Sequence, residues 1–369
     1  MIKLAVPDIR EEDIKKVMEV IKSGNLVQGK QVAEFESQLC SYTGVANAVV
    51  VSSGTAALHL SLMALGISAN EFVIVPAFTF PATANAVEIV GARCLFTDVD
   101  RRSYVMKPVQ IEKVIHENKH KTIRAIIVVH EFGYPADIKK ISEVAKRHNL
   151  NVIEDAACAL GTLADGYHVG HYSDLACLSF HPRKALTTGE GGAVITKNSE
   201  IANRIRSLRN HGIEATNSGI DFTSPGLNYR MTDFQATLAF GQLERFNDEL
   251  DKRRELAKIY CKLLKKEEKL LLPEVDVGHS WQSFMVVLHE SLCRQKVING
   301  LNKKGIETNL GAQALNCLKY FKEKYNFKEC NFDNARDLYK SGLVLPLYGK
   351  LSATDIEYIA MSLLYTINS

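Results

Sequence analysis

The chain has 369 residues, of which 46% are hydrophobic, enough for one large domain with a smaller one beside it. Its 45 basic and 42 acidic residues leave a formal charge of +3 and are spread along the chain, which argues against a nucleic-acid partner. One short basic cluster, residues 262–269, is interrupted by leucines and glutamates, as is typical of a solvated helix face.

The N-terminus and the cysteines indicate a cytoplasmic protein. The opening residues, MIKLAVPDIREED, place acids directly after a short apolar stretch, unlike a secretory signal. No apolar run approaches the roughly 18 residues that cross a membrane, so we expect no membrane partner. Because no C-x-x-C spacing occurs, we expect no metal site and reduced, mostly buried thiols at Cys40, Cys94, Cys158, Cys177, Cys261, Cys293, Cys317 and Cys330.

The first half of the chain alternates helices with short apolar strands. Apolar residues at helical spacing predict helices over 11–23, which ends at Gly24, and over 32–43. A strand over 46–51 then stops at the turn Ser52-Ser53-Gly54-Thr55, and a helix over 56–65 follows. The alternation continues with strands over 72–75, 92–96, 125–129, 152–154 and 175–180 and with helices over 83–89 and 137–148.

This alternation predicts an α/β fold with a mostly parallel sheet and helices on both of its faces. Ligands of such sheets bind beyond the carboxyl ends of the strands. The residues that end strands are therefore candidate site residues: 53–56, 78–80, His130, Asp155 and Ser179.

The rest of the chain completes the large part and then predicts a smaller α+β part. A strand over 193–196 and a helix over 200–210 come first, and the polar segment 213–226 predicts a mobile or interfacial loop. One long amphipathic helix is predicted over 233–264, and the sequence FMVVL indicates a strand at 284–288. We expect a large domain over residues 1–250 and a small α+β domain over residues 251–369.

Three features are each weak evidence for a cofactor site. The turn SSGTAA opens a helix whose free N–H groups suit a phosphate, although an ordinary helix cap has the same pattern. Asp155 is either a functional carboxylate or a cap or ion-pair partner, and Lys184 alone would be a surface lysine. Together they favour pyridoxal phosphate (PLP), because its aldehyde needs an amine, its pyridine nitrogen an anion and its phosphate hydrogen-bond donors.

Ordered motifs give a resemblance along essentially the whole chain. They are SSGTAALHLSLMALGI, VPAFTFPATANAVEIVGA, VVHEFGYPADI, VIEDAACALG, LSFHPRKALTTGEGGAVIT, LRNHG and GLNYRMTDFQATLAFGQLERF. With these motifs the sequence resembles the DegT/DnrJ/EryC1/StrS family of PLP-dependent nucleotide-sugar aminotransferases. The resemblance implies the type I fold of PLP-dependent transferases, which is the fold of aspartate aminotransferase.

The resemblance implies roles for three residues around the ring of the cofactor. Lys184 would form a Schiff base with PLP and later move a proton between the Cα of the amino donor and the cofactor. Asp155 would pair with the pyridinium nitrogen, so that the ring can accept electrons. Phe80 matches the aromatic residue that stacks on the ring, with a core phenylalanine as the alternative.

The resemblance also implies which residues hold the phosphate and the amino donor. Thr55 and Ala56 match backbone donors to the phosphate, and Ser179 matches a hydroxyl donor. Asn228 matches a residue that reaches the phosphate from the neighbouring subunit, which implies a homodimer with shared active sites. Arg230 is either a clamp for the donor's carboxylate, which guanidinium binds in a bidentate fork, or a member of a structural ion pair.

Three further residues near the inferred site have open roles. Relatives commonly carry His or Gln at the position of Cys158, and since a thiol is a weak donor, we expect any contact with the cofactor's ring oxygen to be weaker here. His130 and His181 are either catalytic or hydrogen-bonded structural imidazoles.

One branch of the family has His in place of the lysine and acts as a sugar dehydratase, so Lys184 favours transamination.

The resemblance implies transfer of an amino group from L-glutamate to a nucleotide-linked 4-keto-6-deoxyhexose, such as dTDP-4-keto-6-deoxyglucose. The product would be a 4-amino-4,6-dideoxy sugar nucleotide. One alternative is an aminotransferase for a nucleotide-linked 3-keto sugar, which would use the same catalytic residues. Another is a PLP-binding regulator without turnover, which would need an additional DNA-binding domain. The sequence leaves the nucleotide and the stereochemistry of the new amine open.

Overall fold

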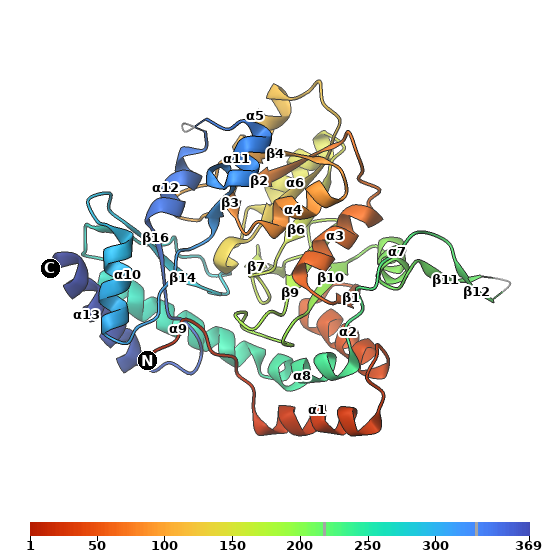
Figure 1. Ribbon diagram of the computed structural model, residues 1–369, viewed down its shortest axis with the longest axis horizontal. Coiled ribbons are helices and arrows are strands. Elements are labelled where there is room, and N and C mark those ends of the chain that lie inside the picture. The colour runs from red at the N-terminus through yellow and green to blue at the C-terminus, as the bar shows by residue number, and fades with distance from the viewer. Residues whose placement is uncertain (217–218, 329–330) are drawn as a thin grey trace.

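A seven-stranded sheet forms the centre of the computed structural model, which describes residues 1–216, 219–328 and 331–369 (Figure 1). The strand order is β1-β10-β9-β6-β5-β2-β4. Strand β10 runs antiparallel to β1 and β9, and the other neighbours pair in parallel, which confirms the predicted α/β fold. The strands are β1 (Asn47–Val51), β2 (Phe72–Pro76), β4 (Arg93–Thr97), β5 (Ile123–Val129), β6 (Asn151–Asp155), β9 (Leu175–Ser179) and β10 (Gly192–Thr196).

Helices cover both faces of this sheet, and alternate residues of one strand enter different cores. In β5, Ile127 packs with α3, α4 and α7, whereas Ile126 and Val128 pack with α5 and α6. Burial on both faces requires apolar residues at every position, which explains the continuous apolar runs in the sequence. The helices around the sheet are α2 (Lys30–Thr43), α3 (Gly54–Ala64), α4 (Ala82–Ile89), α5 (Pro108–Glu117), α6 (Ile138–Arg147), α7 (Ser199–Arg209) and α8 (Asp233–Glu244).

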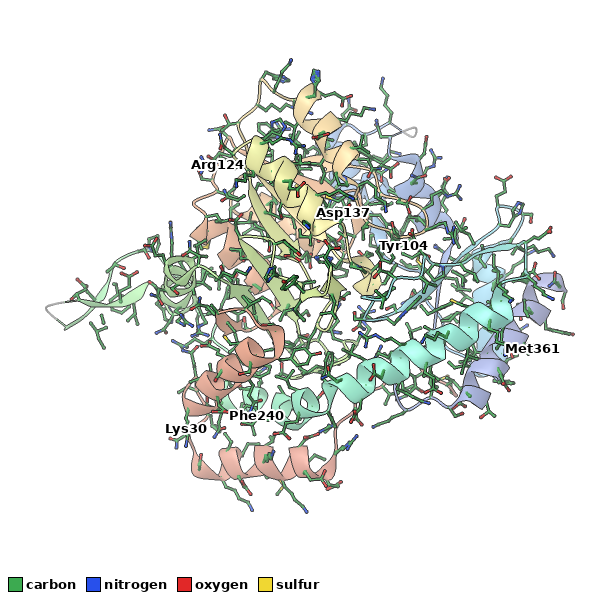
Figure 2. The ribbon with its side chains drawn as sticks, turned by 180° about the vertical axis from the view of Figure 1, so that it is seen from behind. Lys30, Tyr104, Arg124, Asp137, Phe240 and Met361 are labelled. Atoms are coloured by element: carbon green, nitrogen blue, oxygen red, sulfur yellow. The ribbon has the colours of Figure 1, made fainter. Side chains whose placement is uncertain are left out.

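The single long helix predicted over 233–264 is wrong, because the chain forms two helices there. Helix α8 ends at Glu244, the next residue Arg245 (φ −102°, ψ 14°) is not helical, and α9 (Phe246–Leu264) follows. The guanidinium of Arg245 binds the carboxylates of Asp8 and Asp13 at 2.7 and 2.6 Å. The apolar periodicity continues across this one non-helical residue, so the pattern does not reveal the break. Helix α8 stays beside α1 (Glu11–Ser23), while α9 runs to the smaller part of the molecule (Figure 2).

Within the polar segment 213–226 the chain forms a β-hairpin where an irregular loop was predicted, so this part of the prediction is wrong, whereas its place at an interface stays a prediction. Its strands are β11 (Ile213–Thr216) and β12 (Gly219–Phe222), and they project away from the body of the molecule (Figure 1). Residues 217 and 218 of this segment lie outside the described residues. Each strand has only four residues, which is too short to show a clear alternation of polar and apolar positions.

The smaller α+β part is built around a three-stranded antiparallel sheet of β13 (Leu270–Leu271), β14 (Phe284–Leu288) and β16 (Gly342–Leu345). The predicted strand at 284–288 is confirmed. This sheet packs against α9, α10 (Arg294–Lys303) and α13 (Ala353–Asn368). Tyr104, labelled in Figure 2, connects the two parts through a hydrogen bond to the Met285 carbonyl at 3.0 Å. The domain boundary at residue 250 stays a prediction, and this position lies within α9.

Short elements complete the described chain. They are β3 (Phe78–Thr79), which pairs with β15 (Gln313–Ala314), β7 (Leu163–Ala164), which pairs with β8 (Tyr167–His168), two 3-10 turns, η1 (Glu131–Gly133) and η2 (Leu315–Cys317), and helices α11 (Lys319–Tyr325) and α12 (Asp333–Ser341).

The cysteines in the described parts of the chain are all free thiols, as predicted. Cys94 and Cys177 are buried, Cys293 is exposed and the others are half-buried, so burial is less complete than expected. Cys330 lies outside the described residues. No helix within the described ranges is long and apolar enough to cross a membrane.

Candidate active site

A cavity of about 530 Å³ lies at the carboxyl ends of the strands of the large sheet, between the two parts of the molecule. Its volume is in the usual range for small-molecule sites. From the large part it is lined by five residues that the sequence predicts for the site: Thr55, Phe80, Asp155, Ser179 and Lys184. From the smaller part it is lined by residues of two loops and of β16, among them Gln282, Ser283 and residues 309–313.

Lys184 lies in the connection between β9 and β10, and its amine donates to the Cys158 sulfur at 2.9 Å. Burial lowers the pKa of the Lys184 amine, but the acidic groups of Cys158, Glu131 and Asp155 act in the opposite direction, and the net shift is upward. Burial also raises the pKa of the Cys158 thiol, so the thiol is neutral near pH 7. The Lys184 amine is therefore protonated near pH 7 in this environment.

Asp155 ends β6 and is only 6% exposed. Its carboxylate accepts a hydrogen bond from the Thr83 hydroxyl at 2.7 Å and one from the Ala157 N–H at 3.2 Å. Burial raises the pKa of Asp155, while these hydrogen bonds and the charge of Lys184 act to lower it. Thr83 is missing from the sequence prediction. Thr83 is fully buried in α4. A polar residue among the apolar residues of this helix is the one feature of the sequence that could have pointed to it.

A close approach between the start of α3 and the end of β9 shapes another wall of the cavity. A Cβ on Gly54 would lie 2.9 Å from the Cβ of Ser179, so only glycine lets the start of α3 come this near to β9. The hydroxyl of Ser53 accepts a hydrogen bond from the Ala56 N–H at 3.0 Å, and Ala56 does not line the cavity. Thr55, in the first turn, is at a position where the N–H has no acceptor within the helix.

The structure does not bring Asn228 and Arg230 to the cavity of their own chain. The Arg230 guanidinium donates to the side-chain carbonyl of Asn210 at 2.5 Å, and Asn228 forms a β-bridge with the same residue. The partner of Arg230 is thus an amide, and the structure of the described residues shows no ion pair for it. Phe80 lies at the rim and is 62% exposed, so it is not a core residue in this chain.

The two histidines with open roles lie in different environments. His130 is fully buried, donates from Nε2 to Glu154 at 2.6 Å and accepts the Ala136 N–H on Nδ1 at 3.1 Å. It does not line the cavity, and we assign it a structural role. His181 lines the cavity, and burial lowers the pKa of its imidazole despite the carboxylate of Glu190 at 3.9 Å.

Glu131 also lines the cavity, although no pattern in the sequence marks it as a site residue. Its side chain lies in the turn η1 and is only 5% exposed. Burial, followed by the charge of Asp155, raises the pKa of Glu131 to about 8. A glutamate after a strand is ordinarily a solvated turn residue, and the motif VVHEFGYP gives no sign that this one is buried.

Comparison with known proteins identifies the family. The sequence model of the DegT/DnrJ/EryC1/StrS aminotransferase family matches residues 7–364. The chain belongs to this family. The aminotransferase is also 33% identical over 368 residues to the spore coat polysaccharide biosynthesis protein SpsC of Bacillus subtilis, with 96% of this chain and 94% of the relative covered.

Solved structures are similar to this aminotransferase over its whole length. Helicobacter pylori PseC, an aminotransferase involved in the biosynthesis of pseudoaminic acid, has a TM-score of 0.92 and 27% identity, with 100% of this chain and 99% of the other covered. The putative sugar aminotransferase Spr1654 of Streptococcus pneumoniae in its PMP form has a TM-score of 0.93 and 26% identity, with 100% and 98% covered. Spr1654 is also solved in a PLP form. These similarities confirm the type I fold.

The cavity of the aminotransferase fits PLP, the cofactor of this family of sugar aminotransferases. It offers a half-buried amine at Lys184 for the aldehyde and a buried carboxyl at Asp155 for the pyridine nitrogen. The helix start at Gly54 and Thr55, together with Ser179, offers donors for the phosphate. These three kinds of group are the ones that PLP requires.

We expect replacement of His130 to destabilise the fold. In His130→Ala, the buried carboxylate of Glu154 and the Ala136 N–H each lose a partner, and the free energy of unfolding should fall by about 3 kcal/mol. His181→Ala is the matched control and should cost less than about 1 kcal/mol, because its imidazole is partly exposed. Urea unfolding at one protein concentration measures both, and equal losses would contradict the structural role of His130.

Proposed function

We propose that this aminotransferase transfers the amino group of L-glutamate to a nucleotide-linked 4-keto-6-deoxyhexose, such as dTDP-4-keto-6-deoxyglucose. The product is then a 4-amino-4,6-dideoxy sugar nucleotide. The observation that carries the proposal is the half-buried amine of Lys184, which lines the same cavity as the buried carboxyl of Asp155. The names of SpsC and PseC support a sugar substrate. The assignment to C4 rests on the resemblance of HPRKALTTGEGG to enzymes that act at this carbon.

When PLP is bound, its ring supplies an electron sink that stabilises negative charge on the carbon next to the amine. Lys184 holds the cofactor and then moves a proton between the Cα of the amino donor and the cofactor. Gln282 fixes the backbone on both sides of the lysine, because it donates to the Arg183 carbonyl at 2.8 Å and accepts the Ala185 N–H at 3.0 Å. The amine therefore approaches the reacting carbon from one fixed side.

Asp155 keeps a negative charge opposite the pyridine nitrogen in this proposal. The Thr83 hydroxyl and the Ala157 N–H hold the carboxylate in one orientation. Burial raises the pKa of Asp155, and a cationic ring nitrogen beside it would lower it again, since an opposite charge favours the ionised form. The charge on Asp155 and the proton on the ring nitrogen thus stabilise each other.

Thr55 and Ser179 bind the phosphate in this proposal, and Phe80 stacks on the ring. The Thr55 N–H and the Ser179 hydroxyl lie on the cavity wall where α3 begins. Ala56 matches a phosphate donor in the family, but it can act as one only if its N–H leaves the Ser53 hydroxyl. Phe80 is at the rim, where a stacked ring would cover much of its exposed surface.

We propose a homodimer with shared sites. Asn228 matches a family residue that reaches the phosphate, and Arg230 is the candidate clamp for the donor's carboxylate, but neither residue lines the cavity of its own chain. Both residues can act at the cavity of a second copy, with Asn228 on the phosphate and Arg230 on the carboxylate of glutamate. The exposed Phe80 supports a partner at the rim. The free cysteines favour a reducing compartment, and we propose that the enzyme acts in the cytoplasm.

The role of Asp155 predicts the behaviour of Asp155→Asn. An amide carries no charge to keep the proton on the pyridine nitrogen, so the rate should fall more than tenfold, a loss above about 1.4 kcal/mol. Thr83→Val keeps the carboxylate and removes one of its hydrogen bonds, and we expect a smaller loss. Single-turnover rates with glutamate at saturating PLP compare the variants. A rate above a tenth of wild type in Asp155→Asn would exclude the proposed role.

The shared site predicts complementation between two inactive variants. Lys184→Ala and Asn228→Ala should each be inactive, but a mixed dimer has one site in which both residues are intact. After subunit exchange in an equal mixture, activity should recover to roughly a quarter of the wild-type value, because half of the dimers are mixed. Native mass spectrometry shows whether exchange has occurred. Exchange without recovered activity would mean that both residues act within one subunit.

The proposed substrate predicts the position of nitrogen in the product. With glutamate and a nucleotide-linked 4-keto-6-deoxyhexose, the enzyme should give a 4-amino sugar that retains its other hydroxyl groups. Nuclear magnetic resonance of the product locates the amine. An amine formed only with a 3-keto sugar would favour the alternative regiochemistry, and loss of a hydroxyl would indicate dehydration. Absence of turnover with every keto sugar, in protein that binds PLP, would favour the non-catalytic alternative.

A further inference from the structure

A second cavity, of about 980 Å³, is lined by residues of β13, β14, η2, α10, α11 and α12. Seven of its lining residues are Lys or Arg and three are Asp or Glu, and we call it the basic cavity. The whole chain, with 45 basic and 42 acidic residues, carries a net charge of only +3. A cavity wall of mostly one sign attracts ions of the opposite sign. Within the described ranges, no residue lines both this cavity and the active site, so the two are separate.

Arg294, the first residue of α10, lies half-buried in the wall of the basic cavity. Its Nη1 donates to the carbonyl of Gly342 at 3.2 Å and also to the carbonyl of Tyr339, and these bonds hold the side chain in place. In the described parts of the chain, its Nε and Nη2 form no hydrogen bond, and no carboxylate pairs with it. A guanidinium with free N–H groups presents a fork that matches two oxygens of a phosphate.

Three further cationic side chains of this wall have no hydrogen bond or ion pair among the described residues. They are Arg101, Lys322 and Lys340. Arg336 differs, since Asp333 and Asp337 pair with it at 2.7 and 3.1 Å. The two other acids of the wall, Glu268 and Glu290, lie next to the ends of β13 and β14. Most of the positive charge around α11 and α12 is therefore left without a partner in the chain.

The start of α10 adds to this positive charge. In the described chain its N-cap residue, Cys293, makes no side-chain hydrogen bond to the helix, and its first turn has no acidic residue. Because the first N–H groups of a helix have no acceptor within it, this end of α10 favours a bound anion. Cys293 and Arg294 both line the basic cavity, so the helix end and the guanidinium act on the same space.

Other parts of the wall suit a ligand that is not only an anion. Leu271, Val287 and Leu292 give an apolar surface. Asn316, which is only 5% exposed, donates from Nδ2 to the Asn331 carbonyl at 2.8 Å, but its side-chain oxygen has no partner within the described residues. Buried acceptors ordinarily have a donor. A ligand with a hydroxyl or amino group supplies one.

We propose that the basic cavity binds a small molecule that carries a diphosphate group. The surplus of four positive side chains exceeds the charge of one phosphate, about −2, and matches two phosphates better. Such a group occurs in a nucleoside diphosphate and in inorganic pyrophosphate. The apolar surface and the unpaired oxygen of Asn316 favour the nucleoside diphosphate. The cavity volume is within the usual range for a ligand of this size.

The first experiment titrates the PLP-loaded enzyme with ADP, pyrophosphate and adenosine by calorimetry, at 150 mM salt without divalent cations. Saturation with PLP keeps the phosphate site of the cofactor filled. We expect ADP to bind, pyrophosphate to bind more weakly, and adenosine to show no binding, because it has no phosphate. Binding of pyrophosphate without ADP would support the diphosphate site with inorganic pyrophosphate as its source. No binding of either would overturn the proposal.

A double variant, Lys322→Gln with Lys340→Gln, tests the wall of the basic cavity. These side chains have no partner in the described chain, so the fold should not change, and the affinity for ADP should fall about tenfold or more. The matched control is Lys139→Gln with Lys146→Gln, which removes the same charge from exposed positions of α6. Its affinity should stay within about twofold of wild type. Equal losses in both variants would mean that ADP responds only to the overall charge.

The exposed thiol of Cys293 shows where the ligand lies, because it lines the basic cavity. Saturating ADP should slow the alkylation of Cys293 by iodoacetamide about tenfold, as peptide mass spectrometry can measure. Cys261, a half-buried thiol of α9 outside the cavity, is the internal reference and should react at an unchanged rate. An unchanged rate at Cys293 with ADP bound would place ADP elsewhere and overturn the proposal.

Discussion

The site depends on one constraint, a half-buried lysine amine that lies among acidic groups. Burial alone would lower the pKa of the Lys184 amine, but the surrounding acids reverse this effect, and the net shift is upward. The parallel register of the sheet brings two of these acids together. Val129 of β5 pairs with Asp155 of β6, so that Glu131, two residues beyond Val129, reaches the same cavity as Asp155. The balance between burial and charge at the amine is therefore a consequence of how two strands align.

Much of the fold could be predicted because burial on both faces of the sheet leaves a plain record in the sequence. The apolar runs gave the strands to within a few residues, and the turns after them indicated where a ligand binds. Thr55, Asp155 and Ser179 were found in this way, since each lies at or just beyond a strand end on the cavity wall. Lys184 needed more information. A lysine in a loop is unremarkable until the neighbouring motifs are recognised.

The features that the sequence did not reveal depend on tertiary contacts. The break at Arg245 is accompanied by two carboxylates from the N-terminal segment, more than 230 residues away along the chain. The burial of Glu131 depends on packing around Phe132 and Gly133, which local propensity does not report. Asn228 and Arg230 are a different case. Their proposed partner is a second copy of the chain, and the structure of one copy leaves them beside Asn210.

The antiparallel strand β10 has a consequence for how the site forms during folding. Strands β9 and β10 are joined by residues 180–191, and Ser179 pairs directly with Gly192 across the base of this connection. The reactive lysine thus belongs to a local hairpin, whereas the carboxylate of Asp155 is brought beside it through the parallel pairing of β6 with β9. Contacts close in sequence have a low entropic cost of closure and form early. We therefore expect the connection that carries Lys184 to close before the pairing of β6 with β9 brings Asp155 beside it.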